Sequence, residues 1–341
     1  MVKVLIVIGV RLDKLAKQKT LSLDNVEPVL VLPMYRSNGM EIAKVLHRLK
    51  SKLGSLRLVV ADEGSDLKAG INLYRKEHPE LDYVPDIAHK LARFLKGELK
   101  NDEAWHELSK RGAETRTRLL QTDLAHLIPP KGRDKARYLN LEELIKWACR
   151  ILFLFEHEDL SHAQQKVMIT EFTWLYDLKP HILEFQQLWL TLTVTRSIIR
   201  NYGISKTSLV MLQEALKKLP LDLRASLFAS RITHFVIEQT EKVHGDEVLL
   251  ASSEVLESLI GRLKHRLRTQ SRSGFTSSCL LASSLCGNID EALLTEALEQ
   301  THTKDLAEWS KEYIGLTVQH RRKAFHKFTS PSFDFELKFG T

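Results

Sequence analysis

The stretch Leu56–Gly70, LRLVVADEGSDLKAG, constrains the fold of this chain more than any other. Leu58–Ala61 is an apolar run of strand length, Asp62 follows it at once, and the nearby glycine permits a tight turn. We expect Ser65 and Asp66 to cap a helix after the turn. A carboxylate at the carboxyl end of a core strand faces the crevice where α/β sheets bind ligands, so Asp62 is a candidate site residue. The plainer interpretation is that Asp62 and Asp66 only form the turn and the cap.

Strands and helices alternate through the first hundred residues. The segment Val2–Leu12 is almost continuously apolar, as in a strand buried on both faces. Two early strands favour a hairpin, and the alternation after them favours a mixed sheet with helices packed on its faces. The expected strands are 2–12, 27–34, 58–61 and 81–84, and the expected helices are 38–53, 67–77 and a third that runs from Asp86 past Phe94.

From about Leu99 to Val243 the pattern is helical throughout, with no strand signal. We interpret this block as an all-helical insertion in an α/β core. The predicted domains are therefore 1–100 for the first part of the core, 101–245 for the insertion, 246–330 for the closing helices, and 331–341 for a tail.

Composition excludes several classes of protein. The 341 residues are 43% hydrophobic and 27% charged, which is typical of an ordinary globular chain. No apolar run is long enough to cross a membrane, and the first residues have the wrong flanks for a signal peptide. Three cysteines without CxxC spacing indicate a reducing compartment and no cysteine-based zinc site. The Rossmann, P-loop and GxSxG motifs are absent.

The segment Ala251–Arg272, ASSEVLESLIGRLKHRLRTQSR, combines acidic and basic residues in one predicted helix. Glu254 and Glu257 are three residues apart and share a helical face. A helix with an acidic start and a basic end also suits the macrodipole, so a plain surface helix is the alternative. The basic residues are Arg262, Lys264, Arg266, Arg268 and Arg272, and a second basic cluster consists of His320, Arg321, Arg322, Lys323, His326 and Lys327. With a net charge of +7, both clusters are compatible with a polyanion such as DNA.

The order of these pieces resembles the ribonuclease H-like catalytic domain of bacterial insertion-sequence transposases of the DDE type, over about residues 1–330. In that family the second catalytic Asp follows a core strand, which matches Asp62 in VVADEGSDLKAGI. A D-x-x-H pair is frequent further on, which matches Asp86 and His89. The last catalytic Glu lies in a helix after the insertion, which matches Glu257 in SSEVLESLIGRLKHR, with Glu254 as the alternative.

The resemblance implies cut-and-paste DNA transposition by Mg²⁺-dependent phosphoryl transfer. Two Mg²⁺ ions held by carboxylates activate a water or a 3′-hydroxyl and stabilise the leaving oxygen. Asp62 and Glu257 would be metal ligands, and His89 would orient the scissile phosphate or support a carboxylate. The basic residues 262, 264, 266 and 268 would face DNA phosphates. The implied partners are transposon ends and target DNA, and no membrane is implied. By analogy with the family, the chain would form a homo-oligomer and would lie in the bacterial cytoplasm at the nucleoid.

One departure from the family pattern concerns the first catalytic Asp. In the family this residue lies on a central strand that pairs beside the strand seen here at Val2–Leu12. The nearest candidates, Asp13 and Asp24, follow that strand and match poorly. We therefore expect the first strand of the fold to be missing and the chain as given to be catalytically impaired, or its true start to lie upstream of Met1.

Two other functions remain open on the sequence. The first is a DNA-binding or regulatory transposase derivative without catalysis, in which the basic helix would bind the DNA. The second is an unrelated Mg²⁺-dependent nuclease that uses Asp62, Asp86 and Glu257 as its own acidic site.

Overall fold

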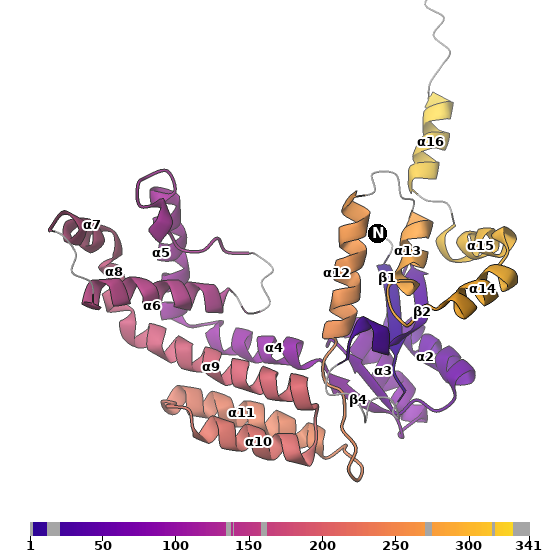
Figure 1. The fold of residues 1–341 in the computed structure, drawn as a ribbon, viewed down its shortest axis with the longest axis horizontal. Helices are drawn as coiled ribbons and strands as arrows, with labels where there is room; N and C mark the ends of the chain where they lie inside the picture. Colours follow the sequence, from indigo (N-terminus) through magenta and orange to yellow (C-terminus); the bar gives the residue numbers. More distant parts are fainter. Residues whose placement is uncertain are drawn as a thin grey trace, which may run out of the picture. The chain divides into compact units, whose positions relative to one another are not determined.

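The computed structural model describes residues 3–11, 21–133, 138, 140–157, 162–269, 275–315 and 318–329 (Figure 1). The chain packs as two compact units: unit 1 combines residues 1–37 with 254–341, and unit 2 contains residues 38–253. Each unit contains a pair of short strands and several helices, so the predicted α/β class is confirmed at that level. The predicted tail, 331–341, lies outside the described residues.

Unit 1 is a hairpin packed with helices. Its strands β1 (Lys3–Gly9) and β2 (Glu27–Met34) pair antiparallel with Lys3 opposite Met34, and the register shifts between Val7 and Ile8. The prediction of two early strands and a hairpin is confirmed. The other elements are η1 (Leu23–Asn25), α12 (Glu254–Thr269), α13 (Phe275–Ser283), α14 (Glu291–Gln300), α15 (Thr303–Trp309), the π-helical η3 (Ser310–Ile314) and α16 (Val318–Thr329).

A small apolar core joins the hairpin side of unit 1 to α12. Leu23, Val26, Leu259 and Cys286 are buried together, and apolar side chains from the first turn of α12 pack at the edge of this core. Leu259 lies on the apolar face of α12 and is fully buried. Burial of this face turns the basic residues of the same helix outward, because an amphipathic helix has only one apolar stripe.

Unit 2 begins with a strand–helix–strand arrangement. Strands β3 (Leu58–Ala61) and β4 (Asp82–Pro85) pair in parallel, with Val60 opposite Val84, and α3 (Ser65–Glu77) connects them. Helix α2 (Gly39–Leu53) precedes β3, and Asn38 caps it, since the side chain of Asn38 accepts a hydrogen bond from the Glu41 N–H at 3.0 Å.

Helices α2 and α3 approach each other at two glycines. A Cβ added to Gly70 would lie 2.4 Å from the Cβ of Ile42, and one added to Gly39 would lie 2.8 Å from that of Ala69. Only glycine allows such an approach, so the pair is fixed closely along its first turns. Five buried residues fill the space between these helices and β4, namely Leu46, Ile71, Tyr74, Leu81 and Tyr83.

The rest of unit 2 is helical, as predicted for the middle of the chain. Every element described between Glu103 and Thr240 is a helix (Figure 1). One apolar core of buried side chains runs through these helices. The helices are α4 (Ile87–Leu99), α5 (Glu103–Leu119), η2 (Ala125–Leu127), α6 (Leu141–His157), α7 (His162–Phe172), α8 (Trp174–Asp177), α9 (Lys179–Tyr202), α10 (Lys206–Lys217) and α11 (Leu223–Thr240).

The structure differs from the sequence predictions in two respects. The described strands form two separate two-stranded sheets, one antiparallel and one parallel, where a single mixed sheet was expected. The predicted cap of α3 is also wrong: Gly64 stands at the cap position, and Ser65 and Asp66 lie inside the helix. The backbone N–H of Gly64 donates to Asp62, so the turn is closed by the preceding carboxylate instead.

Candidate functional site

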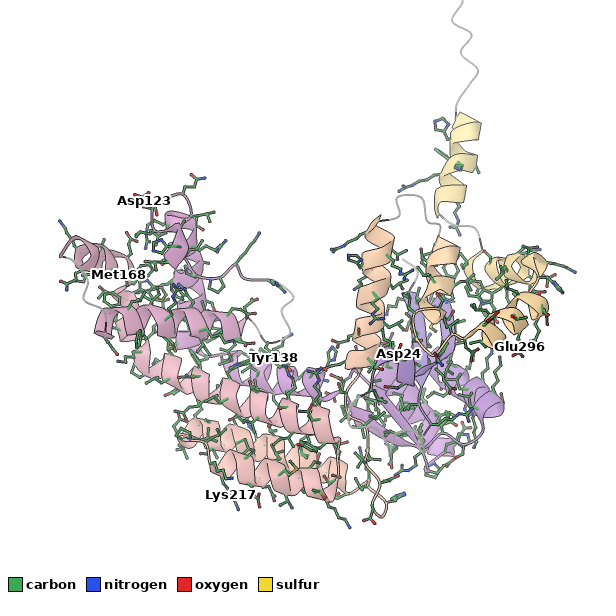
Figure 2. All side chains as sticks on the ribbon, in the orientation of Figure 1. Asp24, Asp123, Tyr138, Met168, Lys217 and Glu296 are labelled. Atoms are coloured by element: carbon green, nitrogen blue, oxygen red, sulfur yellow. The ribbon has the colours of Figure 1, made fainter. Side chains whose placement is uncertain are left out.

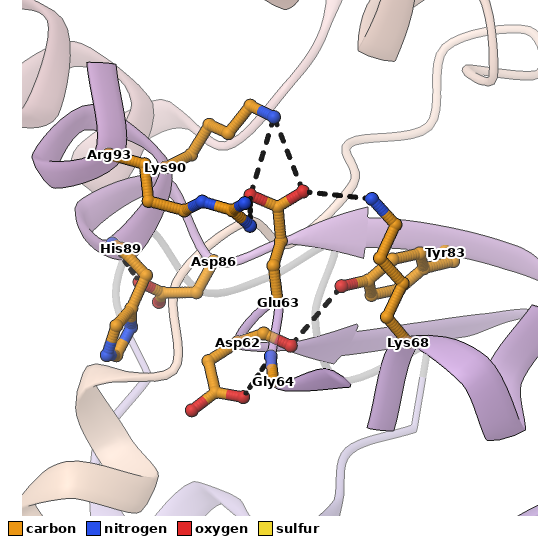
Figure 3. A network of polar contacts seen from close by, with 9 residues as sticks. All are labelled: Asp62, Glu63, Gly64, Lys68, Tyr83, Asp86, His89, Lys90 and Arg93. Atoms are coloured by element: carbon orange, nitrogen blue, oxygen red, sulfur yellow. Dashed lines mark hydrogen bonds and ion pairs between the residues drawn. The ribbon is translucent and has the colours of Figure 1, made fainter. Parts of the chain in front are cut away.

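Three carboxylates gather where β3 and β4 end (Figure 3). Asp62 and Glu63 follow β3, and Asp86 follows β4. Parallel strands end at the same edge of a sheet, which explains why these residues are neighbours in space. Their environments differ strongly, and the difference decides which of them can bind a ligand.

Asp86 is the most buried of the three, with 1% of its surface exposed. One carboxylate oxygen, Oδ1, accepts the His89 N–H at 2.7 Å, and the other, Oδ2, accepts the N–H and the hydroxyl of Ser253 at 2.7 and 2.8 Å. Burial by itself raises the pKa of Asp86, but the hydrogen bonds from His89 and Ser253 outweigh it and lower the pKa to about 2. Both oxygens of Asp86 are thus committed to the start of α4 and to Ser253.

His89 lies in the first turn of α4 and faces Asp86. Its Nδ1 is 2.9 Å from Asp86 Oδ1, so the structure brings the predicted D-x-x-H pair into direct contact. The imidazole is about one-third exposed. A carboxylate on Nδ1 fixes the orientation of the ring, as in many positioned histidines. This geometry is compatible both with a purely structural role at the helix start and with a functional one.

Glu63 is a site residue that the sequence analysis missed. Its side chain is only 5% exposed, and three cations surround it: Lys90 at 3.3 Å, Arg93 at 2.8 Å and Lys68 at 3.5 Å (Figure 3). Burial by itself raises the pKa of Glu63, whereas the charges of Lys90 and Arg93 lower it and prevail. Three cations around one carboxylate leave a local excess of positive charge, which would favour an anion nearby.

Asp62 is the least committed carboxylate of the three. It is half-buried, and its Oδ1 accepts the Gly64 N–H at 3.0 Å. Among the described residues, none donates a hydrogen bond to its other carboxylate oxygen. The Tyr83 hydroxyl donates to the backbone oxygen of Asp62 at 3.3 Å. Burial and then the charges of Glu63 and Asp62 raise the pKa of Tyr83 to about 12, so this hydroxyl keeps its proton at neutral pH.

These contacts decide which carboxylates suit a magnesium ion. Mg²⁺ prefers oxygen ligands that are not already saturated. Asp62 fits that requirement through one oxygen, whereas Asp86 and Glu63 do not, because hydrogen bonds or cations hold them. This edge of unit 2 therefore offers one carboxylate ligand, not a complete set.

The predicted last acidic ligand belongs to unit 1. Glu257 and the alternative, Glu254, both lie in the first turn of α12 and are half-buried. Ser253, the residue before this helix, donates its hydroxyl to Asp86. The N–H of the same serine also donates to Asp86, and no motif in the sequence signals this link across 167 positions.

The predicted DNA-binding residues of α12 are all on its surface. Arg262, Lys264, Arg266 and Arg268 are outside the core, while Leu259 on the opposite face is buried. Arg272 lies outside the described residues. In the second basic cluster, the residues exposed on α16 are Arg321, Arg322, Lys323 and His326, and the side chains of His320 and Lys327 lie outside the described set.

The two weaker acidic candidates do not join this site in any described contact. Asp24 lies in η1 of unit 1 and is exposed (Figure 2). Asp13 lies outside the described residues.

Comparisons with protein-family models, with curated proteins and with solved structures give no match to this chain. Among the residues that the structure describes, no helix is both long and apolar enough to cross a bilayer.

Proposed function

We propose that this chain is the catalytic part of a DDE-type transposase for Mg²⁺-dependent cut-and-paste transfer of DNA, and that its activity as given is impaired because neither Asp13 nor Asp24 matches the first catalytic Asp. The observation that carries the proposal is Asp62, a half-buried carboxylate with one uncommitted oxygen at the carboxyl end of a parallel strand. Sheets of this kind bind ligands at that edge. The surface cations of α12 add a face suited to a phosphate backbone.

The strand pairing is compatible with a ribonuclease H-like core. The described strands form one antiparallel hairpin, β1–β2, and one parallel pair, β3–β4.

In this proposal, each residue has a separate task. Asp62 and Glu257 would each be a ligand of Mg²⁺, and the bound metal would supply activation of the attacking hydroxyl and stabilisation of the leaving oxygen. Asp86 holds the His89 ring so that it can donate to a phosphate oxygen. The four cations of α12, from Arg262 onward, bind the DNA backbone. The partners are transposon ends and target DNA, and a homo-oligomer would hold two ends together.

The first experiment measures nicking and strand joining of a labelled DNA duplex by the full chain in Mg²⁺. We expect Asp62→Asn and Glu257→Gln to abolish any activity, because each removes a metal ligand. Glu254→Gln separates the two candidates for the last ligand. Asp123→Asn, a change in an exposed loop of unit 2, is the matched control and should leave activity unchanged.

A second readout does not need catalysis. Iron(II) in place of Mg²⁺, supplied with hydrogen peroxide as the oxidant and ascorbate to reduce Fe³⁺ again, generates hydroxyl radicals that cleave a polypeptide backbone close to where the iron binds. We expect Fe²⁺-dependent cleavage near residue 62 that is lost in Asp62→Asn, and Fe²⁺-dependent cleavage near residue 257 that is lost in Glu257→Gln. Absence of cleavage near both residue 62 and residue 257 would remove the proposed Mg²⁺ site and with it the proposed reaction.

A non-catalytic DNA-binding derivative is the second candidate function. The observation that favours it is that Glu63 is held by an ion pair and Asp86 by hydrogen bonds within the protein. Of these three carboxylates, only Asp62 then has an oxygen that can bind a metal ion. In that case DNA binding persists in Asp62→Asn and Glu257→Gln. Replacing the four cations of α12 by Gln should reduce the salt dependence of binding by roughly three to four units of slope, since each phosphate contact contributes about 0.9.

A further inference from the structure

A second cluster of ligand-type side chains lies where the middle of α2 meets the end of α3. It consists of His47 from α2 with Glu77 and His78 from the end of α3, and one donor atom from each lies within 4.8 Å of the others. His47 Nε2 is 3.6 Å from Glu77 Oε2. The His78 side chain is 19% exposed and that of Glu77 is 69% exposed, so the cluster is open to solvent on one side.

The two imidazole rings of the cluster pack against a buried aromatic side chain. Tyr74, which is buried, contacts both rings, with centroids 4.8 Å from His47 and 4.4 Å from His78. The close approach at Gly39 and Gly70 fixes the spacing of the two helices that carry them. The two imidazoles are therefore positioned by packing before any ligand arrives, which lowers the entropic cost of binding.

The donors select a particular class of cation. Two imidazoles and one carboxylate suit Zn²⁺ and its neighbours in the transition series, whereas Mg²⁺ prefers oxygen alone. Donors around a tetrahedral zinc lie roughly 3.3 Å apart. The exposed Glu77 side chain can close the remaining gap by rotation.

The neighbours of His78 provide both an obstacle and a support. The Lys50 ammonium lies 2.8 Å from His78 Nδ1, where it competes with a metal by charge. Glu80 Oε1 is 3.3 Å from the same nitrogen. With Nε2 of His78 on a metal, Nδ1–H would donate to Glu80, which is the usual outer partner of a metal-bound histidine.

We propose that His47, Glu77 and His78 form a surface site for a zinc-class divalent cation that links the middle of α2 to the end of α3. Binding displaces Lys50 from His78 and leaves at least one coordination position to water. The site does not depend on the proposed reaction with DNA, because it uses other residues and another class of metal.

The test measures Zn²⁺ binding to the full chain by competition with a chromogenic chelator, and Co²⁺ binding by its visible absorption. We expect His47→Ala and His78→Ala each to weaken binding by more than about tenfold, since even outer partners of metal sites typically change affinity by 10–100-fold. Lys50→Ala should tighten binding, because it removes the competing ammonium. Zn²⁺ should also raise the midpoint of thermal unfolding of the wild type but not of His78→Ala.

The matched control is His181→Ala. His181 Nδ1 lies 3.6 Å from Glu184 Oε2, the same spacing as between His47 and Glu77, but no third ligand-type side chain completes a cluster there among the described residues. Its loss should leave Zn²⁺ affinity unchanged. Equal Zn²⁺ affinity in wild type, His47→Ala and His78→Ala, with circular dichroism confirming that all three are folded, would overturn the proposal.

Discussion

The ends of β3 and β4 present the same kind of residue in two opposite states. Asp86, after β4, is buried, accepts hydrogen bonds on both oxygens and has a pKa of about 2. Asp62, after β3, is half-buried and accepts one hydrogen bond from the turn that it closes. Both are aspartates at the carboxyl end of a strand, so their position in the sheet does not distinguish them.

The difference arises from what packs above each strand end. Above β4, the first turn of α4 and Ser253 direct three N–H or O–H groups at Asp86. After β3, the cations are directed at Glu63 instead of Asp62. Whether a carboxylate stabilises the fold or can bind a ligand thus depends on how many hydrogen-bond donors and cations face it, not on its position in the chain.

The largest expected effect is that of Asp86→Ala on stability. Removing this carboxylate leaves the donors of His89 and Ser253 buried without an acceptor, which we expect to cost about 3 kcal/mol of unfolding free energy. Urea unfolding followed by tryptophan fluorescence measures it, because four of the five tryptophans lie in unit 2. Asp62→Ala is the control. A loss below about 1 kcal/mol for Asp86→Ala would erase the contrast between the two aspartates.

The second-largest expected effect is the loss of stability that Asp86 causes at low pH. The pKa of Asp86 is lowered from 3.8 to about 2 in the folded state, so the stability it contributes is present above about pH 4 and is lost as the pH falls towards 2. The difference corresponds to about 2 kcal/mol. Unfolding free energies measured between about pH 5 and pH 2 should fall more steeply for the wild type than for Asp86→Asn. Parallel curves for the two proteins would mean that Asp86 titrates normally.

The smallest expected effect is that of Asp62→Asn on stability. An asparagine keeps an oxygen that can accept the Gly64 N–H, so the turn persists and the free energy of unfolding should change by less than about 0.5 kcal/mol. Urea unfolding in the absence of metal measures this. A large loss would show that Asp62 is structural like Asp86, and it would weaken the proposed metal site.

Much of the local structure near the site could be predicted from the sequence. The strand at 27–34 agrees with β2 at both ends, and Asn38 and Asp86 cap the helices that follow them. These features depend on neighbours a few residues away, and their signals are local. The cap of α3 was predicted wrongly because Asp62 accepts the Gly64 N–H from two residues before.

The organisation of the candidate site was less predictable. Glu63 directly follows Asp62 in the sequence, yet its three cations come from α3 and α4. The contact between Asp86 and Ser253 spans 167 positions and has no motif. The pairing of the strands into two sheets could not be predicted from the sequence either, because an apolar run indicates a strand but not the strand with which it pairs.

The sequence by itself determined where strands and helices form, that β3 ends in a carboxylate, and that α12 has an apolar face and a basic one. Periodicity, caps and turn residues act over one or two turns of chain, so they can be recognised in the sequence alone. Only the tertiary structure decided that both oxygens of Asp86 accept hydrogen bonds and that the charged Glu63 is paired with three cations. It also decided that Asp62 has one carboxylate oxygen to which no described residue donates. The state of a buried charge depends on donors brought from distant segments, because packing, not sequence neighbourhood, sets its surroundings.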